Sequence, residues 1–447
     1  MGRLYEMSNY AKDIMKKYFY KGFVGALLLA CGVTGEASTL VNSMDSRLWS
    51  IEDLDAYLNS RGFVETRKRD GVLRLAGDVR ARWIYAKEDL EQKQALAKPT
   101  LPINRYRSEF NLYVDYTAAN SWMTSKMNWV TIAGGESSAA GLDINRAFLG
   151  YRFYKNPETQ AEVFAEIGRS GLGDIFDSDV QFSSNFDGIH LYAARRISES
   201  LPYTLIVHGG PFVVNMAEKE YAWVVETVLN KLPGNFVVKT SVIDWNTLTA
   251  KTNDPADAST AQPAPKPDTK YDYLVWQWLV GKSTAMPWFN GQTKNLYTYG
   301  AYLFNPLAEI PENWKQPAAP ATKVASGKEN HAWFVGCTLG GVRRAGDWSA
   351  TVRYEYVEAL AIPEIDVSGI GRGNQMKFWF AQAIKQGLDP KEANGFTNYK
   401  GVAYQFVMGL TDSVSFRAYA AYSKPANNNL GSEFTYRKYD LGLISSF

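Results

Sequence analysis

The stretch from Val72 to Tyr85 alternates between apolar and polar side chains over fourteen residues. Successive side chains of a strand point to opposite faces, so this period of two predicts one long strand with an apolar face and a charged face. Strands of soluble proteins average about five or six residues, whereas a strand that crosses a membrane needs about 9–11. The apolar positions are Leu73, Leu75, Val79, Ala81, Trp83 and Tyr85, and the charged positions between them are Arg74, Asp78, Arg80 and Arg82.

The composition combines many aromatic residues with a lack of long apolar segments. Of the 447 residues, 46% are apolar and 14% aromatic. Beyond the N-terminal region, no segment holds the ~18 apolar residues that a membrane helix needs. In hydrocarbon a sheet can pair all its backbone groups only by closing on itself. The sequence therefore predicts an all-β protein, a transmembrane antiparallel β-barrel.

Similar alternating segments recur along the chain and are joined by long and short connections in turn. Sixteen strands are predicted, an even number as in single-chain bacterial barrels, with fourteen or eighteen left open. The connection 282–295 is longer than expected for a periplasmic turn, and 359–398 is expected to be a large outer loop with a helical stretch at 375–386. The strands are expected near 72–85, 105–116, 121–133, 146–153, 161–167, 189–197, 203–209, 220–230, 236–248, 271–281, 296–304, 331–343, 348–356, 399–410, 414–422 and 434–447.

The region before the barrel divides into two predicted segments. Residues 1–37 have the basic, then apolar, then small-residue order of a signal peptide, and a short buried helix is the alternative. Residues 38–70 are expected to form a periplasmic segment, with a helix over 40–60 that plugs the pore, mediates oligomer contacts or packs under the barrel. The barrel itself is expected to span 71–447.

The inward-facing charges are the candidate functional residues. Arginines cluster on the predicted inner faces of the first, second and fourth strands. These charges must contact water there, because burying uncompensated charge costs a large free energy. They either set a positive pore wall, or pair with nearby acids and stiffen that wall; both can hold. The pore-lining candidates are Arg74, Arg80, Arg82, Arg105, Arg107, Arg146 and Arg152, with Glu109, Asp115, Glu162 and Glu166.

Charge and cysteine content exclude several partners. Residues 1–37 hold five basic and three acidic residues, so the chain's 48 basic and 46 acidic residues leave 43 of each beyond them. This zero balance argues against nucleic acid as a partner. Cys337 is the single cysteine left, which excludes a disulfide framework. No phosphate-binding loop, dinucleotide fingerprint, metal-binding histidine pair or nucleophile elbow is present, so no cofactor, metal or enzymatic activity is expected.

The last nine residues form a half-apolar strand that carries a family resemblance. Tyr439, Leu441, Leu443 and Phe447 share one face. The strand and its final phenylalanine resemble the terminal strand of bacterial outer-membrane β-barrels, and among these the porins. The resemblance implies that these four residues close the barrel and carry the address read by the insertion machinery. It also implies an outer-membrane location among lipids and a homotrimer.

The loop after the fifth strand is acidic and aromatic. It contains Asp174, Asp177 and Asp179, with Asp187 near its end. In general porins the third outer loop folds into the barrel and narrows it, and this loop is also the third on the outer side. The resemblance therefore implies a constriction in which the aspartates face the arginines. An acidic surface loop and a calcium site are the alternatives.

The expected function is passive diffusion of small hydrophilic solutes and ions through a water-filled channel, as the porin resemblance implies. A structural or adhesive surface barrel is the alternative. A transporter for hydrophobic compounds, plugged by the N-terminal helix, is a third. An open charged lumen favours the first, whereas a lumen blocked by the helix or by loops favours the others.

Overall fold

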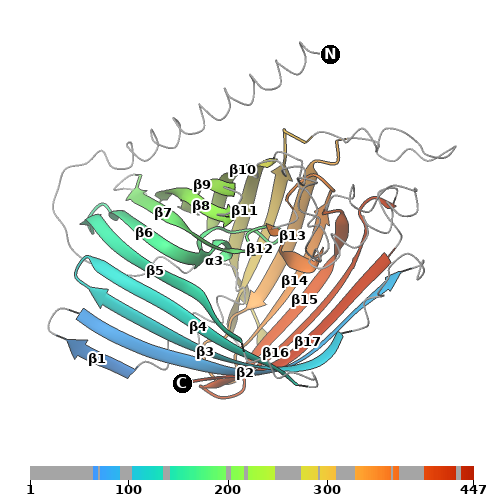
Figure 1. Ribbon diagram of the computed structural model, residues 1–447, viewed down its shortest axis with the longest axis horizontal. Coiled ribbons are helices and arrows are strands. Elements are labelled where there is room, and N and C mark those ends of the chain that lie inside the picture. The colour runs from blue at the N-terminus through green and yellow to red at the C-terminus, as the bar shows by residue number, and fades with distance from the viewer. Residues whose placement is uncertain are drawn as a thin grey trace, which may run out of the picture.

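The computed structural model describes residues 64–68, 71–90, 103–133, 141–197, 203–215, 220–246, 273–289, 292–308, 328–363, 366–371, 397–428 and 434–447. Sixteen of its strands, β2 to β17, form one closed antiparallel ring (Figure 1). The predicted fold class and strand number are confirmed. The expected signal peptide and the helix at 40–60 lie outside the described residues. In the described part of the chain, no helix is long and apolar enough to cross a membrane.

Each of β2 to β17 overlaps one predicted segment, although β2, β5, β8 and β11 extend five or six residues beyond it, and β1 was not predicted. They are β1 (Val64–Lys68), β2 (Gly71–Leu90), β3 (Ile103–Ala118), β4 (Ser121–Ala133), β5 (Gly141–Asn156), β6 (Ala161–Gly171), β7 (Asn185–Arg196), β8 (Thr204–Asn215), β9 (Glu220–Leu232), β10 (Phe236–Asn246), β11 (Tyr273–Pro287), β12 (Thr293–Phe304), β13 (His331–Gly340), β14 (Trp348–Val357), β15 (Tyr399–Gly409), β16 (Val414–Lys424) and β17 (Phe434–Ser446). Two short helical turns, α3 (Leu172–Ile175) and η3 (Gly369–Gly371), lie in connections.

The ring closes where β17 pairs with β2. Tyr439 lies opposite Tyr85, and Leu443 lies opposite Ala81. The backbone of Phe447 extends this pairing by exchanging hydrogen bonds with Gly77, at 3.1 and 2.9 Å. Strand β1 pairs with Gly71–Leu75 of β2. It lies along the same edge of β2 as β17, at residues that β17 does not reach. The last strand therefore closes the sheet, as the sequence predicts.

Tight turns gather at the end of the barrel where Phe447 lies. One of these connections was misjudged from the sequence. The expected strands stopped at Gly281 and restarted at Leu296, leaving fourteen residues between them, but β11 runs to Pro287 and β12 begins at Thr293. The two strands stay paired to their ends, and Trp288 N donates to Gln292 O at 2.7 Å. Five residues, 288–292, make the turn, which is the short connection that an up-and-down barrel requires at this end.

Alternation places apolar side chains on the outer face. On β5, Leu149 is 56% exposed and Phe153 is 64% exposed, although both are large and hydrophobic. Such a face is stable when hydrocarbon rather than water covers it. Near the seam, Trp83, Tyr85 and Tyr439 stack along the same face, with ring centres 6.1–6.3 Å apart.

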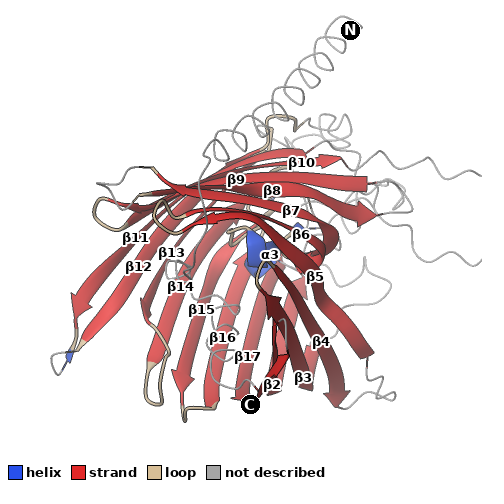
Figure 2. Cartoon of the chain, turned by 90° about the vertical axis from the view of Figure 1, so that its left-hand side faces the viewer, coloured by secondary structure: helices blue, strands red, loops and turns tan. Residues whose placement is uncertain are grey.

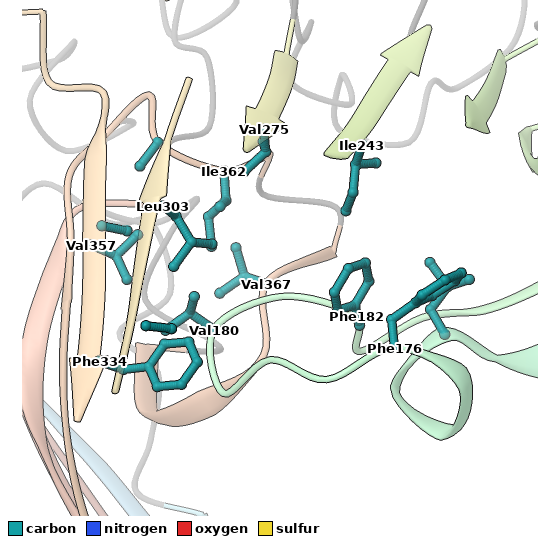
Figure 3. Close-up of a cluster of buried hydrophobic side chains, with 14 of the residues drawn as sticks. Phe176, Val180, Phe182, Ile243, Val275, Leu303, Phe334, Val357, Ile362 and Val367 are labelled. Carbon is teal, nitrogen blue, oxygen red and sulfur yellow. The ribbon is translucent and has the colours of Figure 1, made fainter. Parts of the chain in front are cut away.

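The inner face is divided into a polar side and an apolar side. Strands β2 to β5, β16 and β17 present mostly charged and polar residues, whereas β8 to β13 present residues such as Val224, Ile243 and Leu303. Two connections fold into the ring and cover this apolar side: residues 172–184, which include α3, and the described residues 358–363 and 366–371, which include η3 (Figures 2 and 3). Side chains and loops therefore fill part of the lumen.

The expected outer loop 359–398 needs correction. Its described residues from Ala359 to Ile362 have no exposed surface, and Val367 and Ile370 are also buried in the apolar cluster. Ile362 and Val367 point toward Leu303 and Val180 inside the ring (Figure 3). Packing these apolar side chains against the apolar inner wall removes them from water, which a loop outside the barrel would not achieve. The expected helical stretch at 375–386 lies outside the described residues.

Replacing Gly77 by valine tests the closing contact. A β-carbon at Gly77 would lie 2.3 Å from the Phe447 ring, so Gly77→Val must displace the ring from its place beside Phe110. Overpacking of this kind costs about 1–3 kcal/mol. We expect a lower thermal unfolding midpoint, measured by heat-modifiable migration on gels. The control is Gly141→Val, because a β-carbon there meets nothing within 4 Å. Equal midpoints for the two variants would contradict the expectation.

Candidate functional site in the charged lumen

A cavity of about 530 Å³ lies in the lumen between the polar wall and the inward loop 172–184. Eight cationic and four acidic side chains line it, together with Tyr299, Tyr419, Gln405 and other polar groups. The cations are Arg80, Arg82, Lys126, Arg146, Lys239, Arg353, Arg417 and Lys438, and the acids are Asp174, Asp177, Asp179 and Asp440.

Arg82 is the centre of the charge network on the polar wall. Its guanidinium donates to Glu109 on β3 at 2.8 Å and to Asp440 on β17, with Nε 3.1 Å from Oδ1. Arg107 pairs with the same Glu109 at 2.6 Å, and Arg417 on β16 lies 4.0 Å from Asp440. Because each acid lies within ion-pair distance of two arginines, the network spans four neighbouring strands and keeps an excess of positive charge.

Arg80 belongs to a second, more buried group on the same wall. It donates to Asp78 at 2.6 Å, and Asp78 also accepts from Asn111 and Tyr113 at 2.9 and 3.0 Å. Arg74 and Asp115 lie opposite each other in the register of β2 and β3. Arg105 lies farther along β3, opposite Ile84. The structure therefore places all five predicted arginines of these two strands on the inner face, at different heights.

The predicted residues of β5 and β6 form a separate group. Arg152 donates to Glu162 at 2.6 Å and lies over the Trp122 ring, 5.5 Å from its centre. Glu166 has no arginine partner in the described structure; it accepts from Trp122 at 3.0 Å and contacts His190 at 3.0 Å. Of the expected arginine–acid pairs, those of Glu109 and Glu162 form.

The three loop aspartates each contact a cation on a different part of the wall. Asp174 pairs with Arg146 on β5. Asp177 accepts from Lys239 Nζ on β10 at 2.7 Å. Asp179 accepts from Arg353 on β14 at 3.0 Å and from Tyr299 on β12 at 2.8 Å. The aspartates therefore tie the loop across the lumen. Asp187, which the sequence places near the end of the loop, lies instead in β7 and pairs with Arg169 on β6 at an exposed site, 2.8 Å away.

The second inward loop holds the first by one carboxylate. Asp366, fully buried, accepts from the backbone N–H groups of Phe182 at 2.8 Å and Ser184 at 3.1 Å. Burial raises the pKa of Asp366 to about 6, against the lowering effect of these donors. Burial also raises the pKa of Asp179, although Arg353 opposes the rise. Ser368 adds a backbone bond to Val180 at 3.0 Å.

Sequence reasoning missed several cavity residues. Arg353 and Arg417 lie in predicted strands, at positions that alternate with apolar residues, so an inward direction was readable for both. Asp440 lies in the terminal strand, where the sequence analysis considered only the apolar residues on the opposite face. Lys239 had no such signal, because its role depends on the distant Asp177.

The fold defines the class: a closed sixteen-stranded antiparallel β-barrel with a charged lumen. Solved structures match most of the chain at low sequence identity. Pseudomonas putida OprB at high pH is 11% identical, with 84% of this chain and 94% of that chain covered and a TM-score of 0.49. Salmonella typhi OmpF in complex with daunomycin is 12% identical, with 86% of this chain and 100% of that chain covered and a TM-score of 0.43. The trimer form of Vibrio cholerae OmpT is 11% identical, with 85% of this chain and 100% of that chain covered and a TM-score of 0.41. No protein-family model and no curated protein matches the sequence.

Removing Arg353 tests the tie between the loop and the wall. Arg353→Leu leaves Asp179 and the fully buried Glu355, 3.0 Å from Arg353 Nε, without their cation. Breaking a buried ion pair on one side costs about 3–5 kcal/mol. We expect a lower unfolding midpoint and faster protease cleavage within the loop. Arg169→Leu, which breaks an exposed pair, should cost less than about 1 kcal/mol. A reversed order of the two variants would refute the tie.

The raised pKa of Asp366 gives a pH dependence with a defined sign. Its value of about 6 exceeds the ordinary 3.8, so the folded state binds this proton more tightly than the unfolded state. The contribution of the Asp366 carboxyl group to the free energy of unfolding is therefore complete below about pH 4, and it is lost as the pH rises through about 6. The unfolding midpoint of the wild type minus that of Asp366→Asn should fall across this range. A difference that stays constant would contradict the assignment.

Proposed function

We propose that this protein is an outer-membrane porin through which small hydrophilic solutes and ions diffuse, with a preference for anions. The carrying observation is the cavity in the lumen, with eight cationic side chains against four acidic ones. Charged groups that line an aqueous path set the local potential and enrich ions of opposite sign. The lining offers no acyl, phosphoryl or redox chemistry, so the proposed role is permeation and not catalysis.

The predicted pore-lining residues receive two different roles in this proposal. Arg80, Arg82 and Arg146 line the cavity directly and supply its positive potential. Asp174, Asp177 and Asp179 shape the narrow part because they hold the loop 172–184 in the lumen. The other arginines and glutamates, including Arg152 and Glu162, line the wall above and below.

A structural or adhesive surface barrel is the second candidate. The observation that favours it is the apolar cluster, in which two inward loops fill the side of the lumen formed by β8 to β13. A barrel without a continuous water path would still insert and display loops. The outer-membrane location, the signal peptide, the homotrimer and recognition by the insertion machinery remain predictions from the sequence.

Single-channel recording in a planar bilayer tests both candidates. We expect stepwise conductance, and a reversal potential in a salt gradient that indicates anion preference. Replacing Arg80, Arg82 and Arg146 by glutamine removes three positive charges from the cavity, so the preference should fall toward zero or invert, with conductance retained. Arg344→Gln removes an exposed charge in the turn 341–347 and should leave the preference unchanged.

The two results that matter are distinct. A folded, heat-modifiable barrel that never conducts would discard the diffusion proposal and favour the structural barrel. Conductance with no anion preference, or with a preference that the triple variant retains, would keep the porin but remove the arginines from its selectivity.

A further inference from the structure

Four titratable side chains form a continuous row across β6, β7, β8 and β9 on the inner wall. His190 Nδ1 lies 3.0 Å from Glu166 Oε2, and His190 Nε2 lies 3.2 Å from His208 Nδ1. His208 Nε2 lies 3.1 Å from Glu226 Oε1. Both histidines and Glu226 are buried. The proposed permeation function uses none of these three residues.

The surroundings of the row contain few other charges. Glu166 accepts from Trp122 on β4, and Arg152 on β5 is already paired with Glu162 on β6. Lys239 on β10 is the cation that acts on His208, and it is bound to Asp177 of the loop. Tyr192 on β7 lies near both histidine rings, with ring centres 6.5 and 6.0 Å away.

The three contacts require three protons. Each contact joins two atoms that carry lone pairs, so each needs one hydrogen between them. With both glutamates ionised, three of the four ring nitrogens are protonated, which means that the two histidines share one imidazolium. The charge of the row is then −1. The same total holds for every arrangement that satisfies all three contacts and leaves the outer oxygens of both glutamates unprotonated.

A fourth proton cannot be added at the ring pair without breaking a contact. If the remaining ring nitrogen takes it, N–H faces N–H between His190 and His208, and two imidazolium rings lie side by side. The remaining ring nitrogen is one of the two acceptor sites for this proton. Glu226 Oε2, buried and without a hydrogen-bond partner in the described structure, is the competing site.

The inward loop rests directly on this row. The Phe176 ring stacks on His208 with centres 5.2 Å apart and planes 14° apart, and it meets His190 edge-on at 6.3 Å. Phe176 follows α3 and joins the apolar cluster beside Phe182 (Figure 3). A movement of either histidine ring therefore changes its contact with Phe176, which belongs to the loop that narrows the cavity.

We propose that Glu166, His190, His208 and Glu226 form a proton-binding site that releases the loop 172–184 on acidification. At neutral pH the row holds three protons and supports Phe176. Uptake of the fourth proton separates the two rings, withdraws the stacking partner of Phe176 and loosens the loop. As a regulation of the lumen, the site rests on the proposed porin function.

Nitrogen NMR of the histidine rings tests the proton count. The protein has three histidines, so ¹⁵N-histidine labelling gives three ring systems, and His331→Gln identifies the one outside the row. We expect three protonated nitrogens in the pair at about pH 7.5 and four at about pH 5. Ring signals of the pair that do not change over this range would overturn the proposal, including the case in which Glu226 takes the proton.

Loop release is measured separately, by a spin label at Ser178→Cys in a Cys337→Ser background. We expect label mobility to rise as the pH falls from about 7.5 to about 5. In His208→Gln, the amide accepts from His190 and donates to Glu226, so no N–H pair can collide and the rise should disappear. His331→Gln should retain the rise. Asp366→Asn is included because Asp366 titrates at about 6 and also holds the loop.

The outcomes separate the two proposals. A rise in mobility that persists in His208→Gln, or vanishes only in Asp366→Asn, overturns the histidine site. If His208→Gln does not fold, Phe176→Leu replaces it: the ring titration should remain while the mobility step is lost, and a retained step overturns the coupling. Conductance without any pH-dependent mobility of the label would refute the proton-binding site and support the porin function. Mobility changes in a barrel that never conducts would refute the porin function and support the proton-binding site.

Discussion

The pairing of β17 with β2 is the constraint on which the rest of the structure depends. A sheet in hydrocarbon has no water to satisfy an open edge, so the first and last strands must find each other across the whole chain. The contact between Gly77 and Phe447 extends this pairing to the end of the sheet. Once the ring is closed, the alternation of side chains gives every strand one outward face and one face toward the lumen. Only then does a lumen exist for the two loops to enter.

Inside the ring, charge and apolar surface are separated, and each explains a different property. The apolar wall of β8 to β13 is covered by loop residues such as Val180 and Ile362, which removes both surfaces from water. The polar wall keeps its arginines in networks around Glu109 and Asp440. Removing one partner of such a pair is costly, because the other is left as an uncompensated charge. The loop 172–184 is held by both walls, through Phe176 and Phe182 on one and Asp174 on the other.

The same loop joins permeation to the histidine row. Its aspartates contact cations that line the cavity, and its Phe176 contacts His208. The loop is held by three ion pairs, by the hydrogen bonds of Asp366 and by apolar packing, and the proposed proton site acts on the stack of Phe176 on His208. The proposed selectivity of the arginines and the proposed response to acid therefore depend on different residues of one lumen.

The sequence by itself determined the fold class, a strand number near sixteen and the two faces of the clearly alternating strands, because a period of two is a local property of the chain. Arg82, Glu109 and Leu149 were placed correctly for this reason. The sequence did not determine which side chains contact one another. That Asp177 meets Lys239, that Asp366 binds the loop amides, and that Glu166, His190, His208 and Glu226 align across four strands depend on register and on the path of the loops. Register and loop path arise from pairing between residues far apart in the chain, so only the tertiary structure decided them.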